Sequence, residues 1–190
     1  MHVLDIFYIN YVQYRLMKTY LEYDGLEVLA HRGGAEESLE NTLESFEYSQ
    51  SIGCNYIETD VQVSSDGVPY IFHDNDLKRI LNNPRRFDSY SSQEIDKLRI
   101  FKNHKIPKLS DALNDFPYLS FQIDFKSDDV VMPSLEVIKN TGSKDRVCVA
   151  SFNSKRLSRV RSNFPDLCIS MGPNESIKTF ISSFGLYKKP

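Results

Sequence analysis

Residues 56–63 read YIETDVQV, and this stretch decides the fold. Glu58, Asp60 and Gln62 stand at alternate positions with mostly apolar residues between them, which is the pattern of a β-strand with one polar and one apolar face. Residues 121–126, FQIDFK, repeat the alternation. In an open antiparallel sheet the polar sides would meet water. In a parallel α/β protein they turn toward the enclosed side, because helices cover the outer face.

The rest of the chain favours the second arrangement, because short apolar runs alternate with helical patterns. We expect strands at residues 26–30, 56–63, 68–73, 119–125, 146–151 and 167–171. Helix starts are indicated by Asn41, by Ser91 with Glu94, and by Asn153. Repeated strand, helix, strand predicts a mostly parallel α/β sheet with right-handed crossovers.

Two segments stand apart from this repeat. Residues 1–24 place apolar side chains near helical spacing and predict an amphipathic N-terminal helical extension. Residues 76–110 are polar and in places basic, and we expect them to form a loop insertion in a barrel-like domain that covers residues 25–190.

Composition excludes several classes of protein. The 190 residues are 41% hydrophobic and 26% charged with a net charge of −3, which is typical of a globular protein and argues against a general nucleic-acid binder. The three cysteines are widely spaced, so neither a disulfide framework nor a zinc cluster is indicated. Neither a membrane span nor a signal peptide is evident, and we expect a cytoplasmic protein.

The polar faces of the two strands suggest a metal site. Glu58, Asp60 and Asp124 would lie close together, and like charges at that distance repel one another unless a cation joins them. Oxygen ligands favour a hard ion, so we expect one divalent cation, either Mg²⁺ or Ca²⁺.

Two histidines end predicted strands next to this group. His31 and His73 would lie at the carboxyl ends of parallel strands, where barrel enzymes carry out their reactions. Imidazole titrates near neutral pH, so one ring can remove a proton from a nucleophile while the other protonates a leaving oxygen. Arg32 and Lys126 would bind a substrate oxyanion. A cation, an acid/base pair and anion-binding groups together suit the hydrolysis of a phosphate ester.

These residues also form an ordered set that resembles the glycerophosphodiester phosphodiesterase family of the phospholipase C-like phosphodiesterase superfamily. The set runs from residues 31–33 (HRG) through 40–42 (ENT), 58–61 (ETDV), 66–67, 73–74 and 77–79 to 106–109, 124–126 and 151–152. The resemblance implies a (β/α)₈ TIM barrel that hydrolyses glycerophosphodiesters to glycerol 3-phosphate and an alcohol with a divalent cation. It aligns Glu58, Asp60 and Asp124 with the metal ligands, His31 and His73 with the acid/base pair, and Arg32, Lys126 and Asn41 with substrate-binding positions.

The chain departs from the family pattern in three places. Asp124 stands where the family usually has glutamate, and Leu39 replaces a proline. Only six candidate strands are found in the 165 residues from position 26 onward, whereas a barrel of this kind needs about 200 residues or more. We therefore expect an incomplete barrel, truncated at its C-terminal end, whose open edges self-association would cover.

Two other functions remain open. The missing part of the barrel favours a truncated remnant without catalysis that binds a phosphate ligand or a partner chain. The aromatic residues near the N-terminus favour, more weakly, a lysophospholipase D type of activity on acylated substrates.

Overall fold

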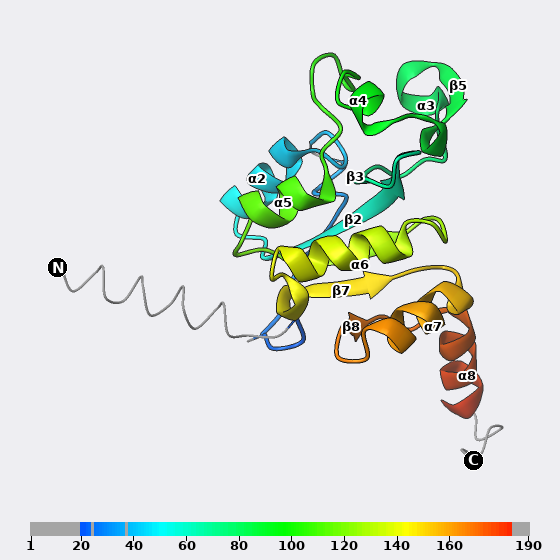
Figure 1. Ribbon diagram of the computed structural model, residues 1–190. Coiled ribbons are helices and arrows are strands. Elements are labelled where there is room, and N and C mark those ends of the chain that lie inside the picture. Colours follow the sequence, from blue (N-terminus) through cyan, green and yellow to red (C-terminus); the bar gives the residue numbers. More distant parts are fainter. Residues whose placement is uncertain (1–19, 24, 37, 184–190) are drawn as a thin grey trace, which may run out of the picture.

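The computed structural model describes residues 20–23, 25–36 and 38–183. Most of the predicted N-terminal helical extension, residues 1–24, lies outside the described residues. Among the described residues, strands and helices alternate as expected (Figure 1). The strands are β1 (Leu29–His31), β2 (Tyr56–Val63), β3 (Pro69–Ile71), β4 (Asp76–Leu77), β5 (Asn83–Arg86), β6 (Ser120–Phe125), β7 (Val147–Ala150) and β8 (Cys168–Ile169). The helices are α2 (Leu43–Ser51), α3 (Lys78–Leu81), α4 (Ser92–Ile95), α5 (Leu109–Asp115), α6 (Val131–Asn140), α7 (Ser154–Asn163) and α8 (Pro173–Ser183), with short 3₁₀ turns η1 (Phe87–Ser89) and η2 (Lys144–Arg146).

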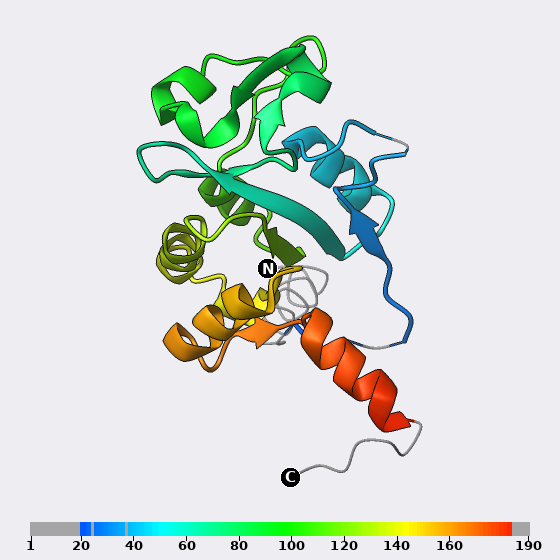
Figure 2. The same ribbon diagram turned by 90° about the vertical axis from the view of Figure 1, so that its right-hand side faces the viewer.

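Five of the strands form a parallel sheet in the order β1-β2-β6-β7-β8. The sheet curves as an open arc with β1 and β8 at its two ends, and within the described residues it does not close into a barrel (Figure 2). The apolar core lies on the helix-covered side and includes Phe46 of α2 against Phe121 of β6, with ring centroids 5.7 Å apart. The opposite side of the arc carries the polar side chains of β2 and β6.

The sixth strand of the sheet corrects one expectation. The predicted strand at residues 68–73 is β3, and it is antiparallel to β2, with Val61 opposite Ile71 and Val63 opposite Pro69. The turn between them contains Gly67, whose φ of 84° suits glycine. His73 therefore follows a hairpin that turns back along β2, and it does not end a parallel strand.

The capping predictions are confirmed for two helices and wrong for one. Ser91 forms a capping box with Glu94, and the Asn153 side chain accepts hydrogen bonds from the first turn of α7. Helix α2, however, is capped by Thr42, whose hydroxyl accepts from the backbone N–H of Ser45. Asn41 has φ 56°, and its side chain points to other partners, described below.

Residues 76–110 are not the plain loop that the sequence suggested. They contain β4, β5, α3, α4 and the start of α5 (Figure 1). Their apolar side chains pack around a second apolar cluster. This cluster is buried and comprises Tyr70, Phe72, Leu77, Phe87, Tyr90, Ile95, Ile100 and Ile106. The insertion is therefore a small folded unit attached to the β2–β3 hairpin.

Asp66 fastens the hairpin to the insertion, and its charge should contribute to stability. Its carboxylate accepts from the Ser64 hydroxyl at 2.6 Å and from the Ser92 hydroxyl and N–H at 2.6 and 2.8 Å, and these bonds lower the pKa of Asp66 from 3.8 to about 2. Because the pKa of Asp66 is lower in the folded than in the unfolded state, its charge stabilises the fold fully at a pH above the unfolded-state pKa. This stabilisation is lost as the pH falls toward the folded-state pKa. We expect Asp66→Asn to destabilise the protein at neutral pH, and we expect urea unfolding to show this difference shrinking as the pH falls below 3.8. A difference that does not change with pH would contradict this.

Candidate active site

The register between neighbouring strands brings the predicted site residues together. Glu58 lies opposite His31 of β1 on one side, and Asp60 lies opposite Asp124 of β6 on the other. Side chains at paired positions of parallel strands point to the same face of the sheet. The two acid-bearing strands therefore present their carboxylates to the same side of the arc, as the sequence predicted.

Lys126 lies between two of these carboxylates. Its ammonium group is 2.6 Å from Asp60 Oδ1 and 2.6 Å from Asp124 Oδ2. Burial disfavours the charged form of Lys126, but the hydrogen bonds to Asp124 and Asp60 outweigh it and raise the pKa of the lysine above its usual value. Lys126 is thus a fixed cation at the centre of the acidic group.

Among the three carboxylates, Glu58 has no ion pair with a lysine or arginine side chain in the described part of the chain. It accepts a hydrogen bond from the backbone N–H of Arg32 at 3.1 Å, and His31 Nε2 lies 3.9 Å away. Burial raises the pKa of Glu58 from 4.5 to about 7, and the neighbouring negative charges of Asp60 and Asp124 add to this shift. Glu58 therefore takes up a proton more readily than an exposed glutamate does.

Asn41 is buried just before α2, and its side chain contacts Asp60 of the acidic group. Its Nδ2 donates to Asp60 Oδ2 at 2.9 Å, and its Oδ1 accepts from the Thr59 hydroxyl at 2.8 Å. Only 3% of Asn41 is exposed. This placement suits the orientation of Asp60 better than direct contact with a substrate.

His73 reaches the same region by way of the β2–β3 hairpin. The backbone N–H of Phe72 donates to Asp60 O at 3.0 Å, so the residue before His73 is held beside Asp60. Gln62 extends from β2 and donates to Asp74 O at 3.1 Å. His73 Nδ1 lies 2.6 Å from Asp74 Oδ1, so the ring has a carboxylate partner on one nitrogen.

Arg32 lies between two acids. Its Nη1 is 3.2 Å from Glu40 Oε2, and its Nε is 3.3 Å from Asp60 Oδ2, a distance that allows an ion pair although the groups are not aligned for a hydrogen bond. Both Arg32 and Lys126 are mostly buried, at 18% and 17% side-chain exposure. The two predicted anion-binding groups therefore approach Asp60 from different sides.

Three residues with defined contacts were given no role by the sequence. Glu40, Asp74 and Arg79 form ion pairs that connect Arg32 to His73. Each lies within or next to a stretch of the family resemblance, but only the folded chain brings residues 40 and 79 into contact. The adjacency of Asp74 to His73 was the available signal.

The donor set fits a hard cation. Three carboxylates face one region, and Asp124 Oδ1 is buried without a hydrogen-bond partner among the described residues. An oxygen in this state is suited to a metal ligand. With Lys126 between Asp60 and Asp124, no three acidic, histidine or cysteine side chains in the described part of the chain surround one point as ligands of a metal ion do.

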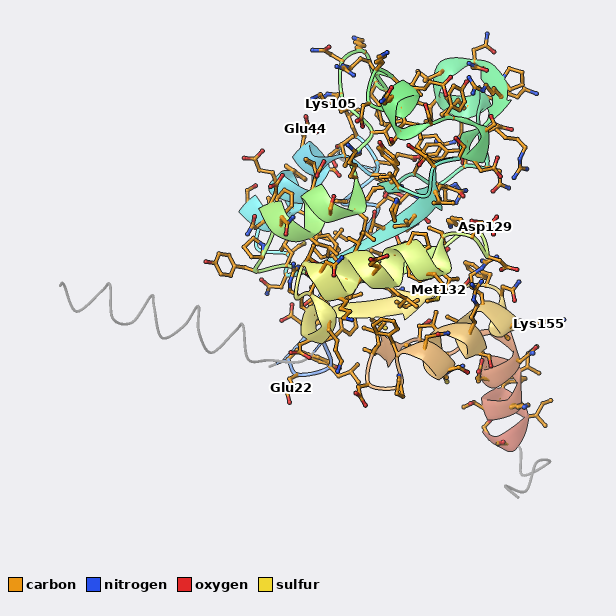
Figure 3. The ribbon with its side chains drawn as sticks, in the orientation of Figure 1. Glu22, Glu44, Lys105, Asp129, Met132 and Lys155 are labelled. Carbon is orange, nitrogen blue, oxygen red and sulfur yellow. The ribbon has the colours of Figure 1, made fainter. Side chains whose placement is uncertain are left out.

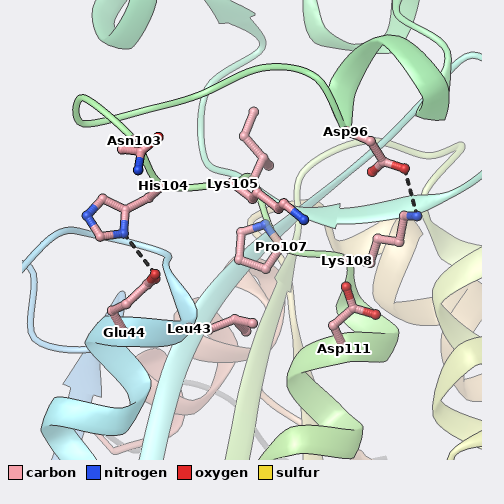
Figure 4. Close-up of a pocket in the computed structure, with 10 residues that line it drawn as sticks. Leu43, Glu44, Asp96, Asn103, His104, Lys105, Pro107, Lys108 and Asp111 are labelled. Carbon is pink, nitrogen blue, oxygen red and sulfur yellow. Dashed lines mark hydrogen bonds and ion pairs between the residues drawn. The ribbon is translucent and has the colours of Figure 1, made fainter.

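A cavity of about 440 Å³ lies elsewhere, between α2, the end of the insertion and α5 (Figure 4). His104 Nδ1 pairs with Glu44 Oε1 at 2.9 Å on one wall, and Lys108 pairs with Asp96 on the other. Glu44 and Lys105 are labelled where α2 meets the insertion in Figure 3. None of the predicted site residues lines this cavity, so we place the candidate site at the carboxylates of β2 and β6.

Comparison with known proteins decides the family. A model of the glycerophosphoryl diester phosphodiesterase family matches residues 31–171, a stretch that contains every predicted site residue. The chain belongs to this family. It is 30% identical over 141 residues to the probable glycerophosphodiester phosphodiesterase 2 of Mycobacterium tuberculosis. That match covers 74% of the chain but 53% of the relative, so the chain spans about half the length of this family member.

Solved structures confirm the fold. The glycerophosphoryl diester phosphodiesterase domain of a Mycobacterium tuberculosis protein superposes with a TM-score of 0.76 at 22% identity, over 88% of this chain and 68% of that one. A phosphodiesterase of Oleispira antarctica, solved with the product sn-glycerol-3-phosphate, superposes with a TM-score of 0.70 at 26% identity, over 76% and 64% of the two chains. The prediction of an incomplete TIM barrel is confirmed by these matches and by the open sheet.

Within the described residues, no helix combines the length and the apolar character needed to cross a bilayer.

Proposed function

We propose that this chain carries the site of a metal-dependent glycerophosphodiester phosphodiesterase, which releases glycerol 3-phosphate and an alcohol. The observation that supports it most directly is the strand register, which brings Glu58, Asp60 and Asp124 to one face with Lys126 among them. The family match and the product bound to the Oleispira antarctica phosphodiesterase support the same substrate class.

In this proposal Glu58, Asp60 and Asp124 would hold Mg²⁺ or Ca²⁺, with Asn41 orienting Asp60. The cation, when bound, would neutralise negative charge on the phosphoryl oxygens. With the cation held by these carboxylates, Lys126 would no longer be needed to neutralise Asp60 and Asp124, and its ammonium group would be available to a phosphate oxygen. Arg32 supplies a second positive group from the β1 side.

The two histidines would handle the protons. His73 has Asp74 on Nδ1, which leaves Nε2 for the substrate, and His31 is 69% exposed beside Glu58. One imidazole would take the proton of the attacking nucleophile, and the other would protonate the departing alkoxide. This division of work needs both rings on the same face of the sheet, and the register of β1 with β2 supports it for His31.

The direct test is hydrolysis of glycerophosphocholine by the purified chain with Mg²⁺, with Ca²⁺ and with a chelator. We expect glycerol 3-phosphate to appear with one of the two ions and to disappear with the chelator. No turnover with either ion, together with a melting temperature raised by glycerol phosphate, would favour the remnant that binds phosphate without catalysis. A comparison of lysophosphatidylcholine with glycerophosphocholine tests the lysophospholipase D alternative.

Glu58→Ala should remove a ligand of the proposed cation and lower kcat/KM by about 100-fold or more. Glu47, exposed on α2, offers a matched control, and Glu47→Ala should leave the rate unchanged. Circular dichroism of both variants should equal that of the parent. Full activity in Glu58→Ala would contradict the proposed ligand set.

We also propose a cytoplasmic protein that self-associates. The cysteines Cys54, Cys148 and Cys168 are all free, which suits a reducing compartment. In the described residues β1 and β8 each pair on one side only, and exposed strand edges favour association. Light scattering tests this, and a monomer at assay concentrations would contradict it.

A further inference from the structure

Arg79 lies in the insertion but contacts the candidate active site. It is in α3, where Ile80 and Leu81 pack against the apolar cluster of the insertion, and Leu77 just before the helix belongs to that cluster. The Arg79 side chain is 49% exposed and does not belong to that cluster. The apolar neighbours therefore anchor α3 while Arg79 is free to extend toward Asp74 and Glu40.

The guanidinium group of Arg79 contacts both of these acids at once. Its Nε donates to Asp74 Oδ2 at 2.7 Å, and its Nη2 donates to Glu40 Oε1. The second oxygen of each acid contacts a predicted site residue: Asp74 Oδ1 is 2.6 Å from His73 Nδ1, and Glu40 Oε2 is 3.2 Å from Arg32 Nη1. Among the described residues Arg79 is thus the link between the partners of His73 and of Arg32.

These contacts stabilise the charged forms of both acids. Burial opposes ionisation of Glu40 and Asp74, but Arg79 outweighs it, helped by Arg32 at Glu40 and by His73 at Asp74, and the pKa of each carboxyl lies below its usual value. The two carboxylates are therefore anions, and each accepts a hydrogen bond from the planar guanidinium group of Arg79. A planar group with fixed donors restricts the rotation of the acids more than a lysine would.

The consequence is a fixed orientation for His73. A carboxylate on Nδ1 places the proton of the neutral ring on that nitrogen and leaves Nε2 to exchange a proton with the substrate. An acid/base group works only when it is aimed within a narrow range of positions. If Asp74 rotates, His73 loses this restraint, although no contact with the substrate is removed.

We propose that Arg79 is a positioning residue, which orients His73 through Asp74 and Arg32 through Glu40 and so makes the insertion part of the catalytic apparatus. This rests on the proposed phosphodiesterase function. Loss of Arg79 should lower kcat through His73, whereas KM should change little, because Arg32 keeps its contact with Asp60 when the link through Glu40 is broken.

The kinetic test compares Arg79→Gln, Arg79→Lys and Asp74→Asn on glycerophosphocholine. We expect Arg79→Gln to lower kcat by about 10- to 100-fold with little change in KM, and Arg79→Lys to recover part of the loss. Asp74→Asn should lower kcat by a similar factor. The double variant should lower it little further, because both substitutions act on the same histidine ring. Arg86→Gln, which breaks an exposed ion pair with Asp88 in the same insertion, is the matched control and should have parental kinetics. Parental kcat in Arg79→Gln, or a change in KM alone, would overturn the proposal.

A second measurement does not depend on turnover. Nitrogen NMR of the neutral His73 ring should show the proton on Nδ1 in the parent and a mixture of both tautomers in Arg79→Gln. An inactive parent with this tautomer change would contradict the proposed function while leaving the positioning role intact. An unchanged tautomer in Arg79→Gln would overturn the positioning role itself.

Discussion

His73→Ala is expected to lower kcat/KM for glycerophosphocholine by about 10²- to 10⁴-fold, which is the range that general acid–base catalysis contributes. His73 has a carboxylate on one ring nitrogen and follows a hairpin that places it at the level of Asp60. The substitution removes the ring and leaves the proposed metal ligands in place. We therefore expect the loss to appear in the rate and not in the affinity for the cation.

His104→Ala is the matched control for this variant. His104 pairs with Glu44 on the wall of the cavity in Figure 4, away from the carboxylates of β2 and β6. It should keep parental kcat/KM, and both variants should keep the parental circular dichroism spectrum. Equal activity in His73→Ala and His104→Ala would remove His73 from the mechanism.

Arg146→Met is expected to destabilise the fold by about 3 kcal/mol, because it leaves several buried carbonyl groups without a donor. Arg146 donates to the backbone oxygens of Leu113, Phe116 and Leu119, at 3.1 Å for Phe116 and 2.8 Å for Leu119. Burial lowers the pKa of Arg146 to about 10, and no ion pair with an acid is found for it among the described residues. The arginine therefore stabilises the end of α5 and the entry to β6 through its hydrogen bonds.

Urea unfolding of Arg146→Met against Arg99→Met tests this. Arg99 is exposed, and its hydrogen bonds go to the backbone oxygens of Asp96 and Leu98 at the surface. Its loss should change the free energy of unfolding by less than about 1 kcal/mol. A similar small change in Arg146→Met would show that water replaces the guanidinium group.

The sequence predicted the acidic face because alternation along a strand depends only on neighbours in the chain. Glu58, Asp60 and Asp124 share a face in the structure for the reason given by their spacing. The hairpin was missed although Asp66-Gly67 stands between two strand-like runs, a dipeptide typical of tight turns. The repeated strand and helix pattern favoured a parallel partner, and only the pairing of Val61 with Ile71 decides the direction.

The contacts of the insertion could not be read from the sequence for a different reason. Its buried residues, such as Phe87, Ile95 and Ile100, follow neither the period of a helix nor that of a strand, so their cluster has no local pattern. The bridge from Glu40 through Arg79 to Asp74 joins residues 39 positions apart, and spacing alone says nothing about it. Asn41 was expected to cap α2, but its left-handed backbone turns the side chain to Asp60 and leaves the cap to Thr42.

Strand β6 lies in the middle of the sheet, and the predicted site residues all come from the part of the chain up to the residue that follows it. All eight predicted site residues fall between His31 and Lys126, whereas β7, β8 and the helices around them contribute none of these side chains. Residues 127–183 thus support the sheet and supply none of the side chains of the proposed site. Substitutions in these residues should therefore first lower the amount of folded protein, and should affect the activity of each folded molecule less.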